Sequence, residues 1–269
     1  MSWRPPGPAL LFCPADRPER YDRAARAADV VILDLEDGVA PPDRPAARGA
    51  LQQADLDPTL TIVRVNPVGT PDHPLDLEAL ATTPYDLVML AKTESADQVA
   101  GLSPRQVVAL CETPRGVLAA TEIAACPATV AMMWGAEDLV AALGGRSSRR
   151  PDGPYGDVAR HARSQVLLSA GAYGVAAIDA VHLDIGDLEG LRGEAIDAAA
   201  SGFVATACIH PSQVAVVRDA YRPTEEELAW AQRVLAAAVD ARGVFSFEGR
   251  MVDSPVLRHA EHIVERGAN

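Results

Sequence analysis

Short apolar runs alternate with amphipathic or alanine-rich segments along most of the chain. The runs predict buried strands at residues 9–15, 30–37, 61–66, 87–94, 106–111, 130–134, 176–185 and 204–212. Apolar residues fill consecutive positions in these runs, which is typical of parallel strands covered on both faces. The segments between them predict helices at 17–28, 43–54, 75–81, 115–126, 157–171, 187–200 and 212–221, with a short one capped by Ser95.

This regular alternation predicts a parallel sheet, and eight strand–helix units predict closure into a (β/α)8 TIM barrel. The 269 residues and the 48% hydrophobic content suit a barrel of about 250 residues. A doubly wound open sheet is the alternative, but no glycine-rich phosphate fingerprint follows the first strand. We expect a TIM-barrel domain at 1–221. Residues 222–269 should form a C-terminal helix and arm that packs on the barrel mouth or on a neighbouring subunit.

Composition narrows the class of protein. The formal net charge is −13 and the isoelectric point is near 4.8, which argues against a nucleic-acid surface but not against an anionic ligand. The four cysteines form no CxxC pair and three lie in apolar runs, so we expect buried free thiols in a reducing compartment. No signal peptide is recognisable, and no apolar run approaches the roughly 18 residues of a membrane span. We therefore expect a soluble, cytoplasmic protein that does not bind a membrane.

Charged residues collect where the predicted strands end, which is the face that carries the active site of a TIM barrel. They are Asp34, Glu36, Asp37, Arg64, Lys92, Glu94, Glu112, Asp138, His182, Asp184 and His210. The carboxylates exceed what Arg64 and Lys92 can neutralise, and a hard divalent cation would balance the excess. Mg²⁺ prefers one or two carboxylates together with water and substrate oxygens. No His/Cys cluster has zinc spacing. We predict that Glu112 and Asp138 hold one Mg²⁺.

The same residues have structural interpretations. For Glu112 and Asp138, the alternative to metal binding is a buried structural ion pair with Arg115 or Arg64. A guanidinium on an apolar strand needs an anion, so Arg64 is a candidate for binding substrate or for such a pair.

Three further groups have two interpretations each. Lys92 is the only lysine, and a lysine at a strand end is what a Schiff-base aldolase needs. Its alternative is a structural ion pair with Glu94 or a neighbouring carboxylate. His182 and His210 fit hydrogen-bonded barrel residues better than catalysts. The arginine-rich run 146–150 fits a solvated surface loop, with phosphate binding as the alternative.

Seven ordered motifs identify a family resemblance that covers nearly the whole chain. They are FCPADRPER (12–20), VILDLEDGVAP (31–41), VRVNPVGT (63–70), AKTES (91–95), ETPRG (112–116), WGAEDL (134–139) and CIHPSQ (208–213). Together they resemble the citrate lyase β-subunit-like family, which is grouped with malyl-CoA and citramalyl-CoA lyases and HpcH/HpaI aldolases.

The resemblance implies an Mg²⁺-dependent carbon–carbon lyase on a modified TIM barrel, usually a homotrimer or a dimer of trimers. It assigns the metal to Glu112 and Asp138 and substrate contact to Arg64. The tail sequence GRMVDSP at 249–255 matches a family motif whose Asp is an acid/base, often in the neighbour's site, and this implies the same role for Asp253. The implied substrates are a 3-hydroxyacyl-CoA thioester and a 2-oxo acid such as oxaloacetate, pyruvate or glyoxylate.

The resemblance also implies binding residues. The backbone amides of Gly135 and Ala136 would bind the substrate carboxylate, and Arg17 and Arg20 are placed like the CoA-binding basic residues of relatives. The sequence departs from the family at Ala15-Asp16, where Gly-Asn or Gly-Ser is commoner, and at Ala91, where proline is common. The first departure lies near the expected thioester-carrier site.

Overall fold

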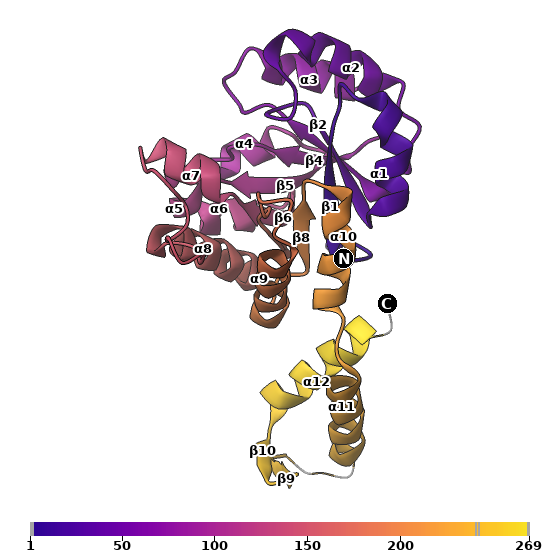
Figure 1. Ribbon diagram of the computed structural model, residues 1–269, viewed down its shortest axis with the longest axis vertical. Helices are drawn as coiled ribbons and strands as arrows, with labels where there is room; N and C mark the ends of the chain where they lie inside the picture. Colours follow the sequence, from indigo (N-terminus) through magenta and orange to yellow (C-terminus); the bar gives the residue numbers. More distant parts are fainter. Residues whose placement is uncertain (1–2, 240, 242, 268–269) are drawn as a thin grey trace. The chain divides into compact units, whose positions relative to one another are not determined.

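The computed structural model describes residues 3–239, 241 and 243–267, and the chain divides into two compact units, Met1–Val217 and Arg218–Asn269. The first unit contains a closed barrel in which the strand order follows the chain order and β8 returns to pair with β1 (Figure 1). Its parallel strands are β1 (Ala9–Pro14), β2 (Val30–Asp34), β3 (Thr61–Val65), β4 (Leu87–Leu90), β5 (Gln106–Cys111), β6 (Thr129–Trp134), β7 (Ala176–Asp179) and β8 (Ala205–Cys208). The predicted (β/α)8 TIM barrel is confirmed.

Helices follow the strands around the outside of the barrel. They are α1 (Tyr21–Ala27), α2 (Arg44–Gln52), α3 (Asp72–Leu80), α4 (Ala96–Ala100), α5 (Pro114–Leu118), α6 (Ala120–Ala125), α7 (Ala136–Ala142), α8 (Asp157–Tyr173), α9 (Leu188–Ser201) and α10 (Pro211–Tyr221), with short 3-10 turns η1 (Pro18–Arg20), η2 (Pro41–Asp43) and η3 (Pro58–Leu60). The Ser95 hydroxyl accepts from the Gln98 amide, which confirms the predicted cap of α4. The helix predicted at 212–221 begins one residue earlier, at Pro211, and the Ser212 amide donates to the His210 ring. The single helix predicted at 115–126 is instead the pair α5 and α6.

The barrel interior is built from alternate strand residues. The buried inward layer comprises Leu10, Val30, Ile32, Ile62, Leu87, Met89, Val108, Leu110, Ala131, Met133, Ala176, Ile178, Ala205 and Ala207. Since side chains on a strand alternate between its faces, the next inward positions after Ile32, Ile62 and Leu110 are Asp34, Arg64 and Glu112. The strand alternation therefore carries charged residues into the carboxyl-terminal mouth of an otherwise apolar barrel.

Four strands end at least three residues earlier than the apolar runs suggested. The strands predicted at 30–37, 87–94, 176–185 and 204–212 stop at Asp34, Leu90, Asp179 and Cys208. After β2, the Asp34 carboxylate accepts hydrogen bonds from the backbone amides of Glu36 and Gly38, at 2.9 and 2.8 Å. These amides are therefore bonded to a side chain rather than to a neighbouring strand, and the chain turns there.

The second unit holds α11 (Glu225–Ala238), the antiparallel pair β9 (Phe245–Phe247) and β10 (Arg250–Val252), and α12 (Ser254–Gly267). The C-terminal helix predicted within 222–269 is α11, and the predicted arm comprises β9, β10 and α12. Thr224 and Glu227 form a reciprocal capping box that starts α11. A small core joins α11, β10 and α12 through Ala231, Val234, Val252, Ala260 and Ile263.

The cysteines and the helices relate to two expectations from composition. None of the four cysteines forms a disulfide, and all but Cys126 are buried, as predicted for reduced thiols. Within the described residues, no helix combines the length and the apolar character that crossing a membrane requires.

Candidate active site

Arg64 lies at the centre of the charged barrel mouth and is held by carboxylates of β2. Its Nε and Nη2 atoms donate to the two Asp34 oxygens at 2.7 and 2.6 Å, and its Nη1 lies 3.2 Å from Glu36 Oε2. The pairing follows from strand register, because Asp34 and Arg64 are Cα partners across β2 and β3. The guanidinium also lies 4.8 Å from the centroid of the Phe12 ring. Arg64 thus has a fixed orientation before any substrate arrives.

Among the described residues, two of the five N–H donors of the Arg64 guanidinium are hydrogen-bonded to Asp34, and Nη1 is ion-paired with Glu36. Other donors therefore remain for an incoming oxygen. The Asp34 carboxylate is saturated by Arg64 and by two backbone amides, so it acts as a structural support. The structure therefore combines both sequence interpretations of Arg64, a buried ion pair and a candidate anion contact.

Glu112 follows β5 as the next inward residue, and its side chain is buried beneath Gly135. A Cβ atom added at Gly135 would lie 2.7 Å from Glu112 Oε2, so glycine is needed where β6 passes over this carboxylate. Burial, followed by the nearby charge of Asp138, raises the pKa of Glu112 to about 8, although Arg64 and Lys92 partly counteract the shift. Without a further cation, the buried pocket favours the protonated acid at neutral pH.

Asp138 lies in the first turn of α7, beside Lys92 at the end of β4. The Lys92 ammonium lies 3.3 Å from Asp138 Oδ1 and 3.2 Å from Asp37 Oδ2, and it also pairs with Glu36. The Lys92 backbone amide donates to Glu112 Oε1 at 3.1 Å. Lys92 therefore connects the two predicted metal ligands, one through its backbone and the other through its side chain.

Lys92 has the unusual backbone φ of +48°, which L-residues adopt mainly at constrained functional or structural sites. Burial alone would lower its pKa, but the hydrogen bond to Glu36 and the charges of Glu112 and Asp138 raise the pKa well above its ordinary value. An imine-forming lysine needs a neutral amine. The surroundings of Lys92 therefore favour the electrostatic interpretation over Schiff-base chemistry.

The donor set fits a hard divalent cation. The described residues include no group of three or more His, Cys, Asp or Glu side chains arranged to hold a metal, so the protein offers two carboxylates, Glu112 and Asp138, rather than a complete cage. Mg²⁺ is bound in this manner, with water and substrate oxygens filling its remaining positions. The raised pKa of Glu112 and the ammonium group beside Asp138 both indicate a position where positive charge is stabilised.

The remaining predicted site residues are less closely associated with this centre. Arg17 and Arg20 follow β1 with side chains that are 52% and 62% exposed, and each pairs weakly with the acidic residue before it. The backbone of Gly135 and Ala136 leads from β6 into α7, next to Glu112. Asp253 belongs to the second unit, where its backbone carbonyl accepts from the Leu257 amide at the start of α12. Its role in the barrel mouth stays a prediction.

The two histidines at strand ends are hydrogen-bonded, as predicted. His182 Nδ1 lies 2.9 Å from Glu194 Oε2, and His210 Nδ1 lies 2.7 Å from the Ser212 hydroxyl. The predicted solvated loop at 146–150 is only partly correct, because Ser148 is 3% exposed and Arg149 pairs with Glu194. Composition gave no signal for this, since serine and arginine are usually exposed.

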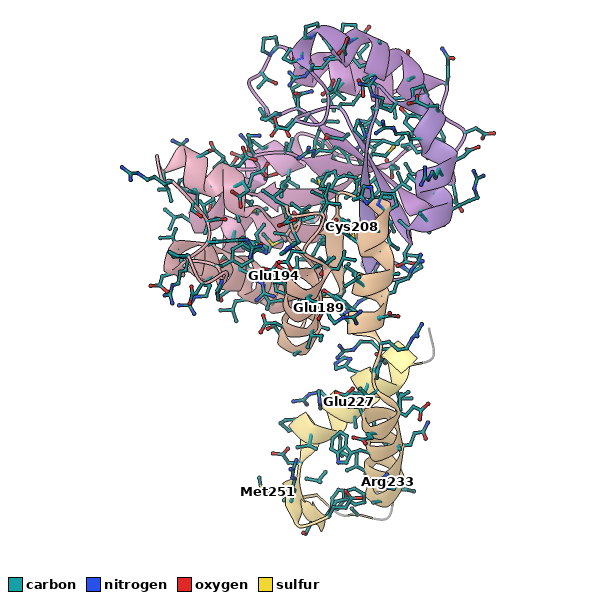
Figure 2. The ribbon with its side chains drawn as sticks, viewed as in Figure 1. Glu189, Glu194, Cys208, Glu227, Arg233 and Met251 are labelled. Carbon is teal, nitrogen blue, oxygen red and sulfur yellow. The ribbon has the colours of Figure 1, made fainter. Side chains whose placement is uncertain are left out.

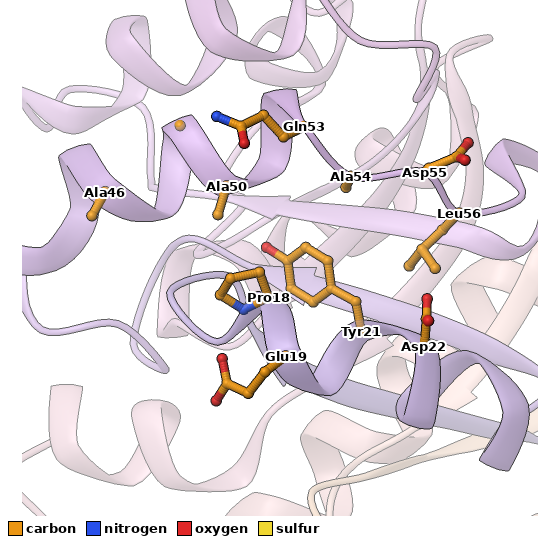
Figure 3. Close-up of a pocket in the computed structure, with 11 residues that line it drawn as sticks. Pro18, Glu19, Tyr21, Asp22, Ala46, Ala50, Gln53, Ala54, Asp55 and Leu56 are labelled. Carbon is orange, nitrogen blue, oxygen red and sulfur yellow. The ribbon is translucent and has the colours of Figure 1, made fainter.

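A groove of about 640 Å³ lies between α1 and α2 (Figure 3). The Tyr21 ring lies between the two helices, and Pro18 and Glu19 extend the groove toward the loop that carries Arg17 and Arg20. Its other lining residues are Asp22, Ala46, Gly49, Ala50, Gln53, Ala54, Asp55 and Leu56. The groove shares no lining residue with the charged mouth, and its acidic side chains make it a poor phosphate site.

The fold and the mouth define a class, an enzyme-like TIM barrel with a pair of carboxylates and a fixed arginine at its carboxyl-terminal face. Comparison with known families is consistent with this class. The family model described as HpcH/HpaI aldolase/citrate lyase matches residues 9–211. The chain therefore belongs to the HpcH/HpaI aldolase/citrate lyase family.

Several relatives are similar along most of the chain. The mitochondrial citramalyl-CoA lyase of Mus musculus is 31% identical over 295 residues, which cover 96% of this chain and 85% of the relative. A crystal structure of protein CitE from Mycobacterium tuberculosis in complex with magnesium, acetoacetate and coenzyme A is also similar. Its sequence is 65% identical to this chain, the match covers 98% of each chain, and the TM-score is 0.95. The structure of the citrate lyase β subunit from M. tuberculosis complexed with oxaloacetate and magnesium matches 81% of this chain and 97% of its own chain. The sequence identity is 66% and the TM-score is 0.80.

Proposed function

We propose that this protein is an Mg²⁺-dependent carbon–carbon lyase that cleaves, or in reverse forms, a 3-hydroxyacyl thioester of the citryl-, citramalyl- or malyl-CoA type. The products would be an acyl thioester and a 2-oxo acid such as oxaloacetate, pyruvate or glyoxylate. The observation that carries the proposal is a buried Glu112 that packs against Gly135 and lies within the electrostatic influence of Asp138, beside an arginine of fixed orientation. Similar proteins are described with magnesium, oxaloacetate and coenzyme A, which supports the choice of ligands.

Glu112 and Asp138 would hold the metal, which when bound would supply Lewis-acid polarisation of the oxygens of the 2-oxo acid. The N–H donors of Arg64 that do not bond to Asp34 would stabilise negative charge as it develops on a reacting oxygen. Because Asp34 and Glu36 already fix the guanidinium, little reorganisation is needed during the reaction. The Gly135 and Ala136 amides would orient the substrate carboxylate.

The proposed cleavage breaks one carbon–carbon bond of the 3-hydroxyacyl thioester. The hydroxyl group loses its proton and becomes the ketone of the 2-oxo acid, and the released acyl carbon takes up a proton, so the reaction is balanced without an oxidant or a reductant. Asp253 would transfer one of these two protons. We propose that it acts in its own site or in that of a neighbouring subunit of a homotrimer.

The thioester carrier would bind at the exposed residues Arg17 and Arg20, whose guanidinium groups suit phosphate oxygens. Similar proteins described with coenzyme A or named for a CoA thioester support a CoA carrier. Buried free thiols and the sequence motifs support a cytoplasmic location for the enzyme.

The test is an assay of 2-oxo acid release from citryl-, malyl-, citramalyl- and methylmalyl-CoA, with Mg²⁺ and with EDTA. We expect turnover of one or more thioesters with Mg²⁺ only. Glu112→Ala and Asp138→Ala should lose both turnover and Mg²⁺ binding, whereas Glu94→Gln, a change at a neighbouring strand end, should retain them. Full activity in EDTA would exclude the proposal, and ligand binding without turnover of any thioester would favour a non-catalytic barrel subunit.

Borohydride trapping separates this chemistry from a Schiff-base aldolase. An imine between Lys92 and a 2-oxo acid would be reduced to a stable adduct that mass spectrometry detects on the only lysine of the chain. We expect no adduct, because the carboxylates around Lys92 hold it as an ammonium ion.

A further inference from the structure

The first turn of α7, which carries Asp138, has no local side-chain cap. Gly135 is the N-cap residue of this helix and provides no side-chain hydrogen bond. A residue with a capping side chain cannot replace it, because a Cβ atom here would collide with Glu112. The position of Asp138 relative to Glu112 must therefore be fixed by contacts from outside α7.

One such contact comes from the loop at residues 147–156, called here the Ser148 loop. The Ser148 hydroxyl donates to Glu137 Oε1 at 2.6 Å, and Ser148 itself is 3% exposed. Glu137 stands directly before Asp138 in the first turn of α7. A hydrogen bond this short to a carboxylate is among the stronger polar contacts in a protein.

The Ser148 loop is itself fixed to the barrel, so it can serve as an anchor. Arg149 and Tyr155 form a backbone bridge, and the Gly156 amide donates to the Ser148 carbonyl at 2.7 Å. The Arg149 guanidinium lies 4.1 Å from the centroid of the Tyr155 ring and pairs with Glu194 of α9, which is labelled in Figure 2. The loop is therefore attached to a second helix by a stacked, paired arginine.

The same loop also packs on the strand that precedes α7. The Tyr155 ring meets the Trp134 ring edge-on, with centroids 5.1 Å apart and an interplanar angle of 72°. Trp134 is fully buried, and its indole nitrogen donates to Asp179 Oδ1 at 2.6 Å. The loop thus contacts the chain on both sides of Gly135, at Trp134 and at Glu137.

We propose that Ser148 is a positioning residue for the metal centre, and this inference rests on the proposed function. By holding Glu137, Ser148 orients the first turn of α7 so that Asp138 faces Glu112. Ser148 touches neither metal nor substrate, and it acts through the helix that carries one of the ligands. Loss of its hydroxyl should therefore weaken metal binding without changing the charge of the site.

The first test compares Ser148→Ala with Ser147→Ala by calorimetric titration with Mg²⁺ and by thermal unfolding of the metal-free protein. Ser147 belongs to the same loop, but within the described part of the chain its hydroxyl bonds to the Arg149 backbone and to no carboxylate. We expect Ser148→Ala to weaken Mg²⁺ binding about tenfold, the value of one charge-assisted hydrogen bond, and Ser147→Ala to leave it unchanged. Equal Mg²⁺ affinity in Ser148→Ala and wild type, with or without a lower melting temperature, would overturn the inference.

A second pair of variants controls for charge and for folding. Glu137→Ala and Glu137→Gln remove the same negative charge, but only glutamine retains an oxygen that accepts from Ser148. Because Glu137 is an exposed residue, both variants should fold. When Ser148 is present, we expect Glu137→Gln to bind Mg²⁺ about tenfold more tightly than Glu137→Ala. When Ser148 is replaced by alanine, the two Glu137 variants should have the same Mg²⁺ affinity.

The outcomes separate this inference from the proposed function. If the wild type binds Mg²⁺ and turns over a thioester while Ser148→Ala has wild-type Mg²⁺ affinity, the positioning role is wrong and the lyase proposal stands. If the wild type does not bind Mg²⁺, both are wrong.

Discussion

Replacing Glu112 by glutamine should stabilise the metal-free protein while abolishing Mg²⁺ binding. Glu112 is 4% exposed, and its pKa is about 8 against an ordinary value of 4.5. Glutamine has the same shape and keeps an oxygen for the Lys92 amide, which lies 3.1 Å from Glu112 Oε1 in the wild type. The change therefore removes the ionisable group and little else.

The direction of the effect follows from proton binding. Below pH 4.5 the Glu112 carboxyl is protonated in both folded and unfolded chains, so it makes no pH-dependent contribution to stability. Between 4.5 and about 8 the unfolded chain has released this proton and the folded barrel retains it, so the free energy of unfolding falls as pH rises. Each pH unit in this window lowers the free energy of unfolding of the wild type by about 1.4 kcal/mol. At pH 7, Glu112→Gln should therefore be more stable than the wild type by about 3 kcal/mol.

Urea unfolding of EDTA-treated protein, followed by circular dichroism from pH 4 to pH 8, measures this difference. The gap between Glu112→Gln and the wild type should open steadily with pH, and excess Mg²⁺ should stabilise only the wild type. Glu94→Gln serves as the matched control, because the Glu94 side chain is 33% exposed and its bond from the Thr113 hydroxyl survives the change. A gap that does not vary with pH, or one of opposite sign, would refute the reasoning about the buried carboxyl.

Two further substitutions and one labelling experiment test other parts of the barrel. Asp34→Ala leaves the Arg64 guanidinium, 11% exposed, without its bidentate partner, and should lower the free energy of unfolding by about 3–5 kcal/mol in a urea titration. Gly135→Ala places a Cβ atom 2.7 Å from Glu112 Oε2 and should weaken Mg²⁺ binding more than tenfold in a calorimetric titration. The Cys111 thiol, fully buried with its pKa raised by burial to about 12, should react with iodoacetamide at pH 8 only after unfolding.

Each of these expectations has a contradicting result. A loss of less than about 1 kcal/mol in Asp34→Ala would mean that the buried ion pair contributes no more than a surface one. Wild-type Mg²⁺ affinity in Gly135→Ala would mean that the chain relaxes around the extra carbon. Rapid labelling of Cys111 in the folded state would mean that β5 opens to solvent.

Much of the fold could be predicted because apolar runs and helical segments are local properties of the chain. Consecutive apolar residues in the run 107–111 are typical of a strand buried on both faces, and eight such runs alternating with helical segments favour a closed barrel. The ends of strands were predicted less well. Asp34 ends β2 because its carboxylate binds the amides of Glu36 and Gly38, and that contact is invisible in the residue pattern.

The candidate site was likewise predicted only in part from the sequence. Charge at strand ends and the family motifs pointed to Glu112, Asp138 and Arg64, since a TIM barrel brings all carboxyl-terminal strand ends to one face. Nothing in the residue pattern indicated that Ser148 would be buried, because serine is mostly exposed in proteins. The loop that contains Ser148 packs on the barrel through Tyr155 and Trp134, which meet only after the chain has folded.

By itself, the sequence determined the order of strands and helices, the parallel barrel and the residue types available at its mouth, since these follow from local hydrophobic patterning and from alternation along each strand. Only the tertiary structure decided which charges pair. Asp34 takes Arg64 because β2 and β3 pair in that register, and Lys92 lies between Glu36 and Asp138 because β2, β4 and α7 meet at one mouth. The energy of a charge depends on its distance to other charges and to water, and those distances do not exist until the chain has folded.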